Sequence, residues 1–177
     1  MKVTYYVAAS LDGFIAGPDG GIDWLDAAHL PDEDFGYGDF IATVDALVMG
    51  RSTWDFVAGV RPWPYGSRPV KVFSNRLIDA RDLAVDRVTG DPAATVRALA
   101  DAGRNHVWVV GGGGLAHSLL ESGDLTDVIL TVIPATLGRG APLLGSHSST
   151  IVWRAASTRS WNNGVVQHHL RPPAENA

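Results

Sequence analysis

Short apolar segments alternate with helix-like segments along most of the chain, and this alternation constrains the fold more than any other feature. The apolar segments are rich in β-branched and aromatic residues, as strands are, and they cover 2–9, 46–49, 70–74, 83–88, 106–110 and 126–133. The segments between them predict helices over about 31–43, 50–60, 92–103 and from 113 to 122. Parallel strands need crossovers of this kind, so the order predicts an α/β fold with a mostly parallel sheet covered on both faces.

The C-terminal part of the chain departs from this alternation. Two segments of alternating polarity, 150–158 and 165–170, flank Asn162-Asn163-Gly164, a strong signal for a tight turn. We therefore expect an antiparallel hairpin at one edge of the sheet. The large apolar side chains of this region are Ile151, Trp153, Trp161 and Val165. An exposed edge rarely tolerates so much apolar area, which predicts a homodimer that covers it.

Length and composition indicate one globular domain, which we place at 1–170, followed by a frayed tail over 171–177. No apolar run approaches the roughly 20 residues needed to span a bilayer, and the N-terminus lacks a secretory pattern. Cysteine is absent, which agrees with a cytoplasmic location, and no histidine spacing is typical of a metal site. The net charge of −5 argues against nucleic acid as a partner. These observations favour a small molecule as the ligand, without a metal.

Four consecutive glycines, 111–114, follow a predicted strand and open a predicted helix. Backbone N–H groups at such a junction bind phosphate, and glycine lets the ligand approach the main chain. We expect a Cβ at Gly112 or Gly113 to block this approach and to leave the fold largely intact. The alternative is a tight turn that needs small residues. An NAD-linked Rossmann dehydrogenase is disfavoured, because the next strand ends at Ile133-Pro134 without the acid that such enzymes place there.

Two further strand ends carry groups that bind anions. Gly50-Arg51-Ser52-Thr53 places a guanidinium and two hydroxyls at a predicted helix start, and Ser74-Asn75-Arg76 ends another strand. One of the hydroxyls could instead only cap the helix. Open α/β sheets bind ligands at the carboxyl ends of their strands, where all three junctions would meet. The sequence therefore predicts a dinucleotide site with more than one phosphate contact.

The motifs as a set resemble the dihydrofolate reductase superfamily. They are Ala8-Ala9-Ser10-Leu11-Asp12-Gly13, Ile22-Asp23-Trp24, MGRSTW at 49–54, VFSN at 72–75 and VVGGGGLAHSLL at 109–120. The chain looks most similar to stand-alone relatives of the reductase domain of the bifunctional riboflavin-biosynthesis deaminase-reductase, over residues 2 to about 170. The resemblance implies a dihydrofolate-reductase-like three-layer fold. It also implies an NADPH-dependent reductase that transfers hydride to a C=N or C=O carbon of a pteridine or a ribosylamino-pyrimidine.

The resemblance also implies which residues hold NADPH. In the family, the strand-end glycines and the arginine-bearing helix start hold the pyrophosphate and the 2′-phosphate, the third junction flanks the adenosine, and two backbone positions contact the nicotinamide. In this sequence these positions are Gly112, Gly113, Gly114, Leu115, Gly50, Arg51, Ser52, Thr53, Ser74, Asn75, Arg76, Ala8 and Ile15.

Catalytic and substrate positions are carried over in the same way. Asp34 falls where dihydrofolate reductases place a buried active-site acid, and Thr131 where they place the threonine bonded to it. Burial would raise the pKa of such an acid. The alternative for Asp34 is compensation of a helix dipole within Asp32-Glu33-Asp34.

The loop 10–30 would close over the nicotinamide, with Trp24 beside the reacting ring. Tyr37, one helical turn beyond Asp34, would face the substrate, and Arg68 would bind an acidic substrate tail or lie free on the surface. Relatives in the riboflavin branch commonly pair as homodimers, so the resemblance implies a homodimer here as well. A different class of function stays open at this point, a non-catalytic module that senses NADPH.

Overall fold

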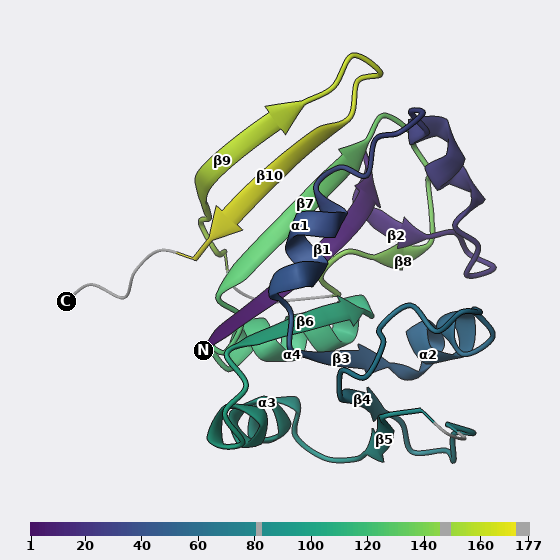
Figure 1. The fold of residues 1–177 in the computed structure, drawn as a ribbon. Helices are drawn as coiled ribbons and strands as arrows, with labels where there is room; N and C mark the ends of the chain where they lie inside the picture. The colour runs from purple at the N-terminus through teal and green to yellow at the C-terminus, as the bar shows by residue number, and fades with distance from the viewer. Residues whose placement is uncertain (81–82, 146–149, 173–177) are drawn as a thin grey trace.

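The computed structural model of the chain describes residues 1–80, 83–145 and 150–172 (Figure 1). The strands of its main sheet are β1 (Lys2–Ser10), β3 (Ala46–Gly50), β4 (Val70–Phe73), β5 (Val85–Val88), β6 (His106–Gly111), β7 (Asp127–Ile133), β9 (Arg154–Ser160) and β10 (Val166–Arg171). Within the described residues they pair in the order β5-β4-β3-β6-β1-β7-β10-β9. The pairs from β5 to β7 are parallel, and those of β10 with β7 and with β9 are antiparallel. The predicted α/β class is confirmed.

Helices cover both faces of the sheet and make the three layers that the sequence predicts. On one face α1 (Tyr37–Thr43) and α2 (Arg51–Val57) contribute Phe40 and Trp54 to a core that also contains Trp108 of β6. On the other face α3 (Pro92–Asp101) and α4 (Gly113–Glu121) pack on a core around Tyr5. Successive strand residues point to opposite faces, so Tyr6 packs against the first core while Tyr5 is buried in the second.

β6 carries one residue more than β3 where the two strands pair. Val48 pairs with Val109, but Met49 pairs with Gly111, so Val110 is a bulge at the end of β6. Bulges re-aim the side chains that follow them, and this one lies directly before the glycine run. The junction between β6 and α4 is therefore shaped by an extra residue as well as by its glycines.

The predicted C-terminal hairpin forms between β9 and β10, and the amide of Trp161 donates to the carbonyl of Val165 across its turn. The exposed apolar edge that was expected beside the hairpin is not present among the described residues. Val165 is fully buried, Trp161 packs near Ile133, and Ile151 and Trp153 pack against the core under α3 and α4. The exposed-area argument for a homodimer is therefore wrong for these residues, and the dimer itself stays a prediction.

The predicted helix 31–43 begins late, at Tyr37. Asp32 and Phe35 have φ angles of 63° and 54°, a left-handed conformation that ends regular helix, and Gly36 follows with a φ of 82°. Residues 31–36 thus form consecutive turns. The acids that suggested a helix start from residue 31 lie in these turns instead.

The loop 10–30 has structure of its own. β2 (Phe14–Ala16) pairs with β8 (Ala141–Pro142), and a 3₁₀ helix, η1 (Asp23–Ala28), follows. The carboxylate of Asp12 accepts hydrogen bonds from Ser10 Oγ at 2.6 Å and from the amide of Gly138 at 2.7 Å. Asp12 therefore ties this loop to the segment between β7 and β8.

The tail begins later than the sequence suggested, because Arg171 still belongs to β10; residues 173–177 lie outside the described residues. Among the described residues no helix is long and apolar enough to cross a bilayer.

Candidate functional site

The carboxyl ends of the parallel strands open into a cavity of about 810 Å³, which we call the apolar cavity. Its walls come from the end of β1, the segment 15–25, α2, and the junction of β6 with α4, on the side where β2 and β8 lie in Figure 1. Most of its lining side chains are apolar, among them Leu25, Phe56 and Val57. Its volume and its mostly apolar lining suit a small organic ligand.

A second cavity, of about 590 Å³, continues the first, and we call it the arginine cavity. Gly50 and Arg51 line it directly before the residues that α2 contributes to the apolar cavity, and Gly114 lines it directly after Gly113. Its far wall is the end of β4 and the residues that follow β5. The two cavities therefore form one cleft along the carboxyl edge of the sheet.

Every residue that the sequence assigned to cofactor binding lines this cleft. The apolar cavity contains Ala8, Ile15, Ser52, Thr53, Gly112 and Gly113. The arginine cavity contains Gly50, Arg51, Ser74, Asn75, Arg76, Gly114 and Leu115. Three junctions far apart in the chain are thus brought together, as expected for the carboxyl ends of neighbouring parallel strands.

The glycines of the run differ in what surrounds them. Gly112 has a φ of 73°, and a Cβ there, as at Gly114, would meet nothing within 4 Å. A Cβ at Gly113 would lie 2.1 Å from the carbonyl oxygen of Pro142. The expectation that Gly113 tolerates a Cβ is therefore wrong, because the backbone of the β8 segment packs on it. Gly112 and Gly114 leave open space of the kind that a pyrophosphate needs.

Positive charge gathers at the arginine cavity. Arg51 is held by Asp55, with its Nε 2.7 Å from Oδ1, and by the carbonyl of Leu77 at 3.1 Å. Ser74 is buried, and its hydroxyl donates to the carbonyl of Arg76 at 2.7 Å, which fixes the turn that carries Arg76. The guanidinium of Arg76 is exposed beside this turn. Two guanidinium groups at one cavity suit an anionic group such as a phosphate.

A polar cluster not foreseen from the sequence borders the apolar cavity at Tyr6. The Tyr6 hydroxyl donates to the carbonyl of Phe35 at 3.1 Å, and the Nε2 of Gln167 donates to the same carbonyl at 3.0 Å and to Thr131 Oγ1 at 2.9 Å. Burial raises the pKa of Tyr6, although the hydrogen bond from Gln167 opposes the shift. Tyr6 precedes Ala8 by two residues on one strand, so the period of two was a signal that both face one side.

The predicted pair of Asp34 and Thr131 does not form. Asp34 is exposed, and its carboxylate accepts the amides of Gly36 and Gly38, each at 2.8 Å. The bonds from Gly38 and Gly36 lower the pKa of Asp34, where the sequence led us to expect a raised one. The reason is the turn over 31–36, which turns Asp34 back to cap the late start of α1. Thr131 is buried, and Gln167 is its partner.

Two further residues predicted for the site, Trp24 and Tyr37, pack against other side chains of the protein. Trp24 packs against Ala28 and Ile133, while its neighbour Leu25 lines the apolar cavity. The buried indole N–H of Trp24 has no partner among the described residues. Tyr37 is not among the described residues that line a cavity, and it packs edge-on against Tyr6.

Arg68 is neither free on the surface nor directed at the cleft. Its guanidinium donates to the carbonyls of Val44 at 2.7 Å, Ile41 at 3.0 Å and Tyr65 at 3.3 Å. Ile41 and Val44 lie at the C-terminal end of α1, where helix carbonyls lack partners of their own. The donors expected to bind an acidic substrate tail are therefore occupied by the backbone.

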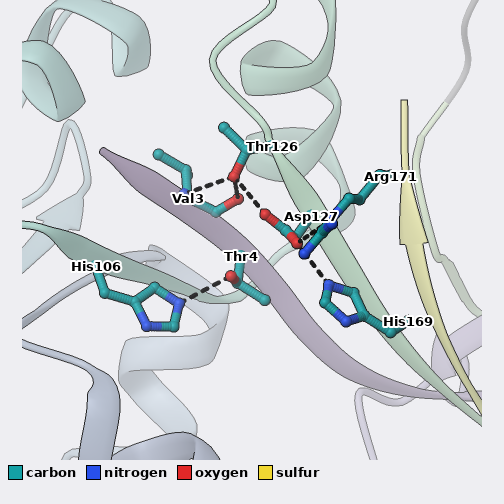
Figure 2. A network of polar contacts seen from close by, with 7 residues as sticks. All are labelled: Val3, Thr4, His106, Thr126, Asp127, His169 and Arg171. Carbon is teal, nitrogen blue, oxygen red and sulfur yellow. Dashed lines mark hydrogen bonds and ion pairs between the residues drawn. The ribbon is translucent and has the colours of Figure 1, made fainter. Parts of the chain in front are cut away.

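A second polar cluster, centred on Asp127, lies at the opposite edge of the sheet, where the parallel strands begin (Figure 2). Burial raises the pKa of Asp127, but hydrogen bonds from Thr126, His169 and Arg171 outweigh this and hold the pKa below its usual value. The cluster thereby compensates a buried charge that joins β7 to β10. Among the described residues no group of His, Cys, Asp and Glu lies close enough together to hold a metal ion.

Comparison with known proteins agrees with this architecture. The model of the RibD C-terminal domain family matches residues 1–167. The Bacillus subtilis protein YwjB is 36% identical over 172 residues, which cover 96% of this chain and 98% of YwjB. A Shewanella sp. PV-4 protein named for riboflavin biosynthesis has a TM-score of 0.87 at 30% identity, covering 97% of this chain and 99% of that one.

The fold extends to more distant proteins. Dihydrofolate reductase from Enterococcus faecalis, solved with NADP(H), has a TM-score of 0.67 at 20% identity, covering 97% of this chain and 96% of the enzyme. At that identity the likeness concerns the fold alone. The family model covers nearly the whole sequence, and so do the two relatives that are at least 30% identical. The chain therefore belongs to the RibD C-terminal domain family and has the fold of dihydrofolate reductase.

Proposed function

We propose that the protein is an NADPH-dependent reductase that transfers hydride to a C=N or C=O carbon of a small heterocycle, of the pteridine or ribosylamino-pyrimidine type. One observation carries this proposal: a single cleft joins an arginine-bearing end to an apolar end, and all the residues expected to hold NADPH line it. NADPH is itself a molecule with a charged adenosine end and an apolar nicotinamide end. The Rossmann alternative loses its support, because the fold is that of dihydrofolate reductase.

The residues present fit the cofactor. The open space at Gly112 and Gly114 would admit the pyrophosphate, and Arg51 and Arg76 would bind the 2′-phosphate that distinguishes NADPH from NADH. Ala8 and Ile15 line the apolar cavity, where the nicotinamide would lie. NADPH supplies the hydride, and the protein supplies orientation and a mostly apolar cavity.

The family supports the proposed type of substrate. A Thermotoga maritima member of this fold is named as a deaminase and 5-amino-6-(5-phosphoribosylamino)uracil reductase; it is 15% identical, has a TM-score of 0.73, and is covered over 56% of its length. The apolar cavity has room for a heterocycle beside the nicotinamide, since about 810 Å³ is within the usual range of ligand pockets. The lack of cysteine agrees with a reducing compartment, so this proposal places the activity in the cytoplasm.

The test is binding followed by turnover. We expect NADPH to bind more tightly than NADH in calorimetric titrations, and to be oxidised when dihydrofolate or the uracil compound named above is added, as followed by its absorbance. Equal affinity for the two cofactors, or no affinity for either, would contradict the proposal.

Tight NADPH binding without oxidation by any heterocycle would instead favour a sensor. One observation favours this alternative: among the described residues, no carboxylate lines the apolar cavity.

A further inference from the structure

Of the described residues that line the apolar cavity, Tyr6 alone carries an ionisable side chain. The other polar side chains there are the hydroxyls of Ser52 and Thr53, which lie at the start of α2 beside the arginine cavity. The expected acid, Asp34, is exposed and occupied by backbone amides. The phenol of Tyr6 is therefore the one acidic group among the described residues of this lining.

The surroundings of Tyr6 allow its hydroxyl to change partner. The hydroxyl donates to the carbonyl of Phe35, but that carbonyl also accepts from Gln167 at 3.0 Å. If the phenol turns to another acceptor, Phe35 keeps a hydrogen bond, so no buried carbonyl is left unpaired. The ring is fixed meanwhile, because it stacks on Phe40 with the centroids 4.4 Å apart.

We propose that the Tyr6 hydroxyl binds the substrate in the apolar cavity and donates a proton to the nitrogen or oxygen beside the carbon that receives the hydride. This inference rests on the proposed function and deepens it, since it assigns the proton donor of the same cavity.

The step balances with the groups named. The carbon of C=N or C=O accepts hydride from NADPH, which is oxidised to NADP⁺, and the π electron pair moves to the nitrogen or oxygen. That atom takes the phenol proton, and the phenolate recovers a proton from water. Tyr6 also borders a polar groove of about 270 Å³ between α1 and the hairpin of β9 and β10, through which water can reach it.

The charges around Tyr6 decide how the reaction depends on pH. Besides burial, the nearby Asp34, Tyr37 and Glu33 raise its pKa, whereas Gln167 lowers it. The ionisable groups that line the groove are Lys2, Asp39, His106, Arg159 and His169. The phenol therefore stays protonated at neutral pH. With a substrate that does not titrate, turnover should be flat from roughly pH 6 to pH 9, whereas a carboxylic acid donor would lose its proton and its effect in or below that range.

The first experiment compares Tyr6→Phe with the wild-type protein, because this change removes the hydroxyl and keeps the stacked ring. We expect kcat with the best heterocyclic substrate to fall on the order of a hundredfold, with an unchanged Kd for NADPH and loss of the solvent isotope effect. Tyr65→Phe is the matched control. Tyr65 is a buried tyrosine whose pKa burial also raises, and it lines none of the described cavities.

A second readout does not depend on turnover. The phenol carbon of each of the four tyrosines is labelled with ¹³C, and Tyr6→Phe assigns the Tyr6 signal. We expect this signal to shift when dihydrofolate or 5-amino-6-(5-phosphoribosylamino)uracil is added to the NADP⁺ complex, while the Tyr65 signal stays in place.

The outcomes separate this inference from the proposed function. If NADPH does not bind, the proposed function fails. If NADPH binds and Tyr6→Phe turns over like the wild type, or if neither heterocycle shifts the Tyr6 signal, the proton-donor role is overturned and the cofactor site stands.

Discussion

The two ends of the cleft are built in different ways. At the arginine cavity, each wall is a short run of consecutive residues at a strand end, such as Gly50-Arg51 or Ser74-Asn75-Arg76. At the apolar cavity, the cluster around Tyr6 joins β1, the turns after residue 31, β7 and β10, so that Tyr6 and Gln167 meet from 161 positions apart in the chain. The walls of the arginine cavity are formed by residues adjacent in sequence, whereas the cluster around Tyr6 is formed by residues that only folding brings together.

Sequence motifs therefore predict the phosphate-binding end of the cleft better than its substrate end. A phosphate is bound by backbone amides and guanidinium groups that a strand-to-helix junction delivers by itself. A substrate-facing donor needs a partner from another part of the sheet, and small changes in a connecting turn decide which side chain supplies it. The predictions below test whether the two ends are as separate as their construction indicates.

The largest effect is expected at the glycine run, where cofactor space and chain packing meet. Gly113→Ala would push a Cβ to within 2.1 Å of the Pro142 carbonyl, so we expect a loss of about 3 kcal/mol or more and a Tm lower by roughly 6–12 °C. Gly114→Ala meets nothing within 4 Å and should keep its Tm while its Kd for NADPH rises. Calorimetry of both variants measures the contrast. A Gly113→Ala protein with normal Tm and weakened NADPH binding would show that packing and cofactor space are not separate there.

A smaller effect is expected from the charges of the arginine cavity. Arg51→Ala should raise the Kd for NADPH roughly 10- to 100-fold and change that for NADH much less, because only NADPH carries the 2′-phosphate. Arg76→Ala should act in the same direction. Arg154→Ala, on β9 and outside the cleft, is the control. If Arg51→Ala slows hydride transfer at saturating NADPH, the two cavities are coupled, and the separation of cofactor binding from the reaction is contradicted.

The smallest effect is expected at Asp12, which joins two loops at the apolar end. Hydrogen bonds from Ser10, Gly138 and Leu137 lower the pKa of Asp12 to about 2. Since the folded pKa lies below the ordinary one, this stabilisation is fully present above about pH 4 and is lost as the pH falls through about 2. Asp12→Asn should therefore lower Tm at neutral pH, with the difference from wild type vanishing in acid. Melting curves across pH measure this, with exposed Asp101→Asn as control; a constant difference would contradict it.

Much of the fold could be read from the sequence because its signals are local. Strand periodicity, the cap at Asp91 and the Asn163-Gly164 turn each specify structure within a few residues, and the structure contains them. The two-stranded pairing of β2 with β8 could not be read, since these strands have three and two residues and are held by long-range contacts.

The site divides along the same line. The strand-end residues of the cleft were foreseen, whereas Asp34 was placed by analogy at a helix start that does not form there. Two left-handed residues, Asp32 and Phe35, make the difference; aspartate adopts a positive φ more readily than most residues, but nothing in the side chain of Phe35 predicts one. Tyr6 was missed because a tyrosine inside a buried strand reads as core. In fact the residue does both: its ring packs against the core and its hydroxyl donates to the carbonyl of Phe35, while Tyr6 also lines the apolar cavity.

The extra residue in β6 limits how this chain can be recombined with its relatives. Val110 sits between a regular ladder and the glycine run, and side chains alternate along a strand with a period of two. Consider a chimaera whose crossover point lies inside 106–113 and whose imported strand lacks the bulge. Its residues after the strand would be shifted in register by one position, so Gly112 and Gly114 would no longer face the cleft as they do here. Crossover points in the connection before β6 or after α4 keep the bulge and the glycines together in one transferred segment. For exchanging the glycine-rich junction within this family, that segment is the smallest piece worth moving.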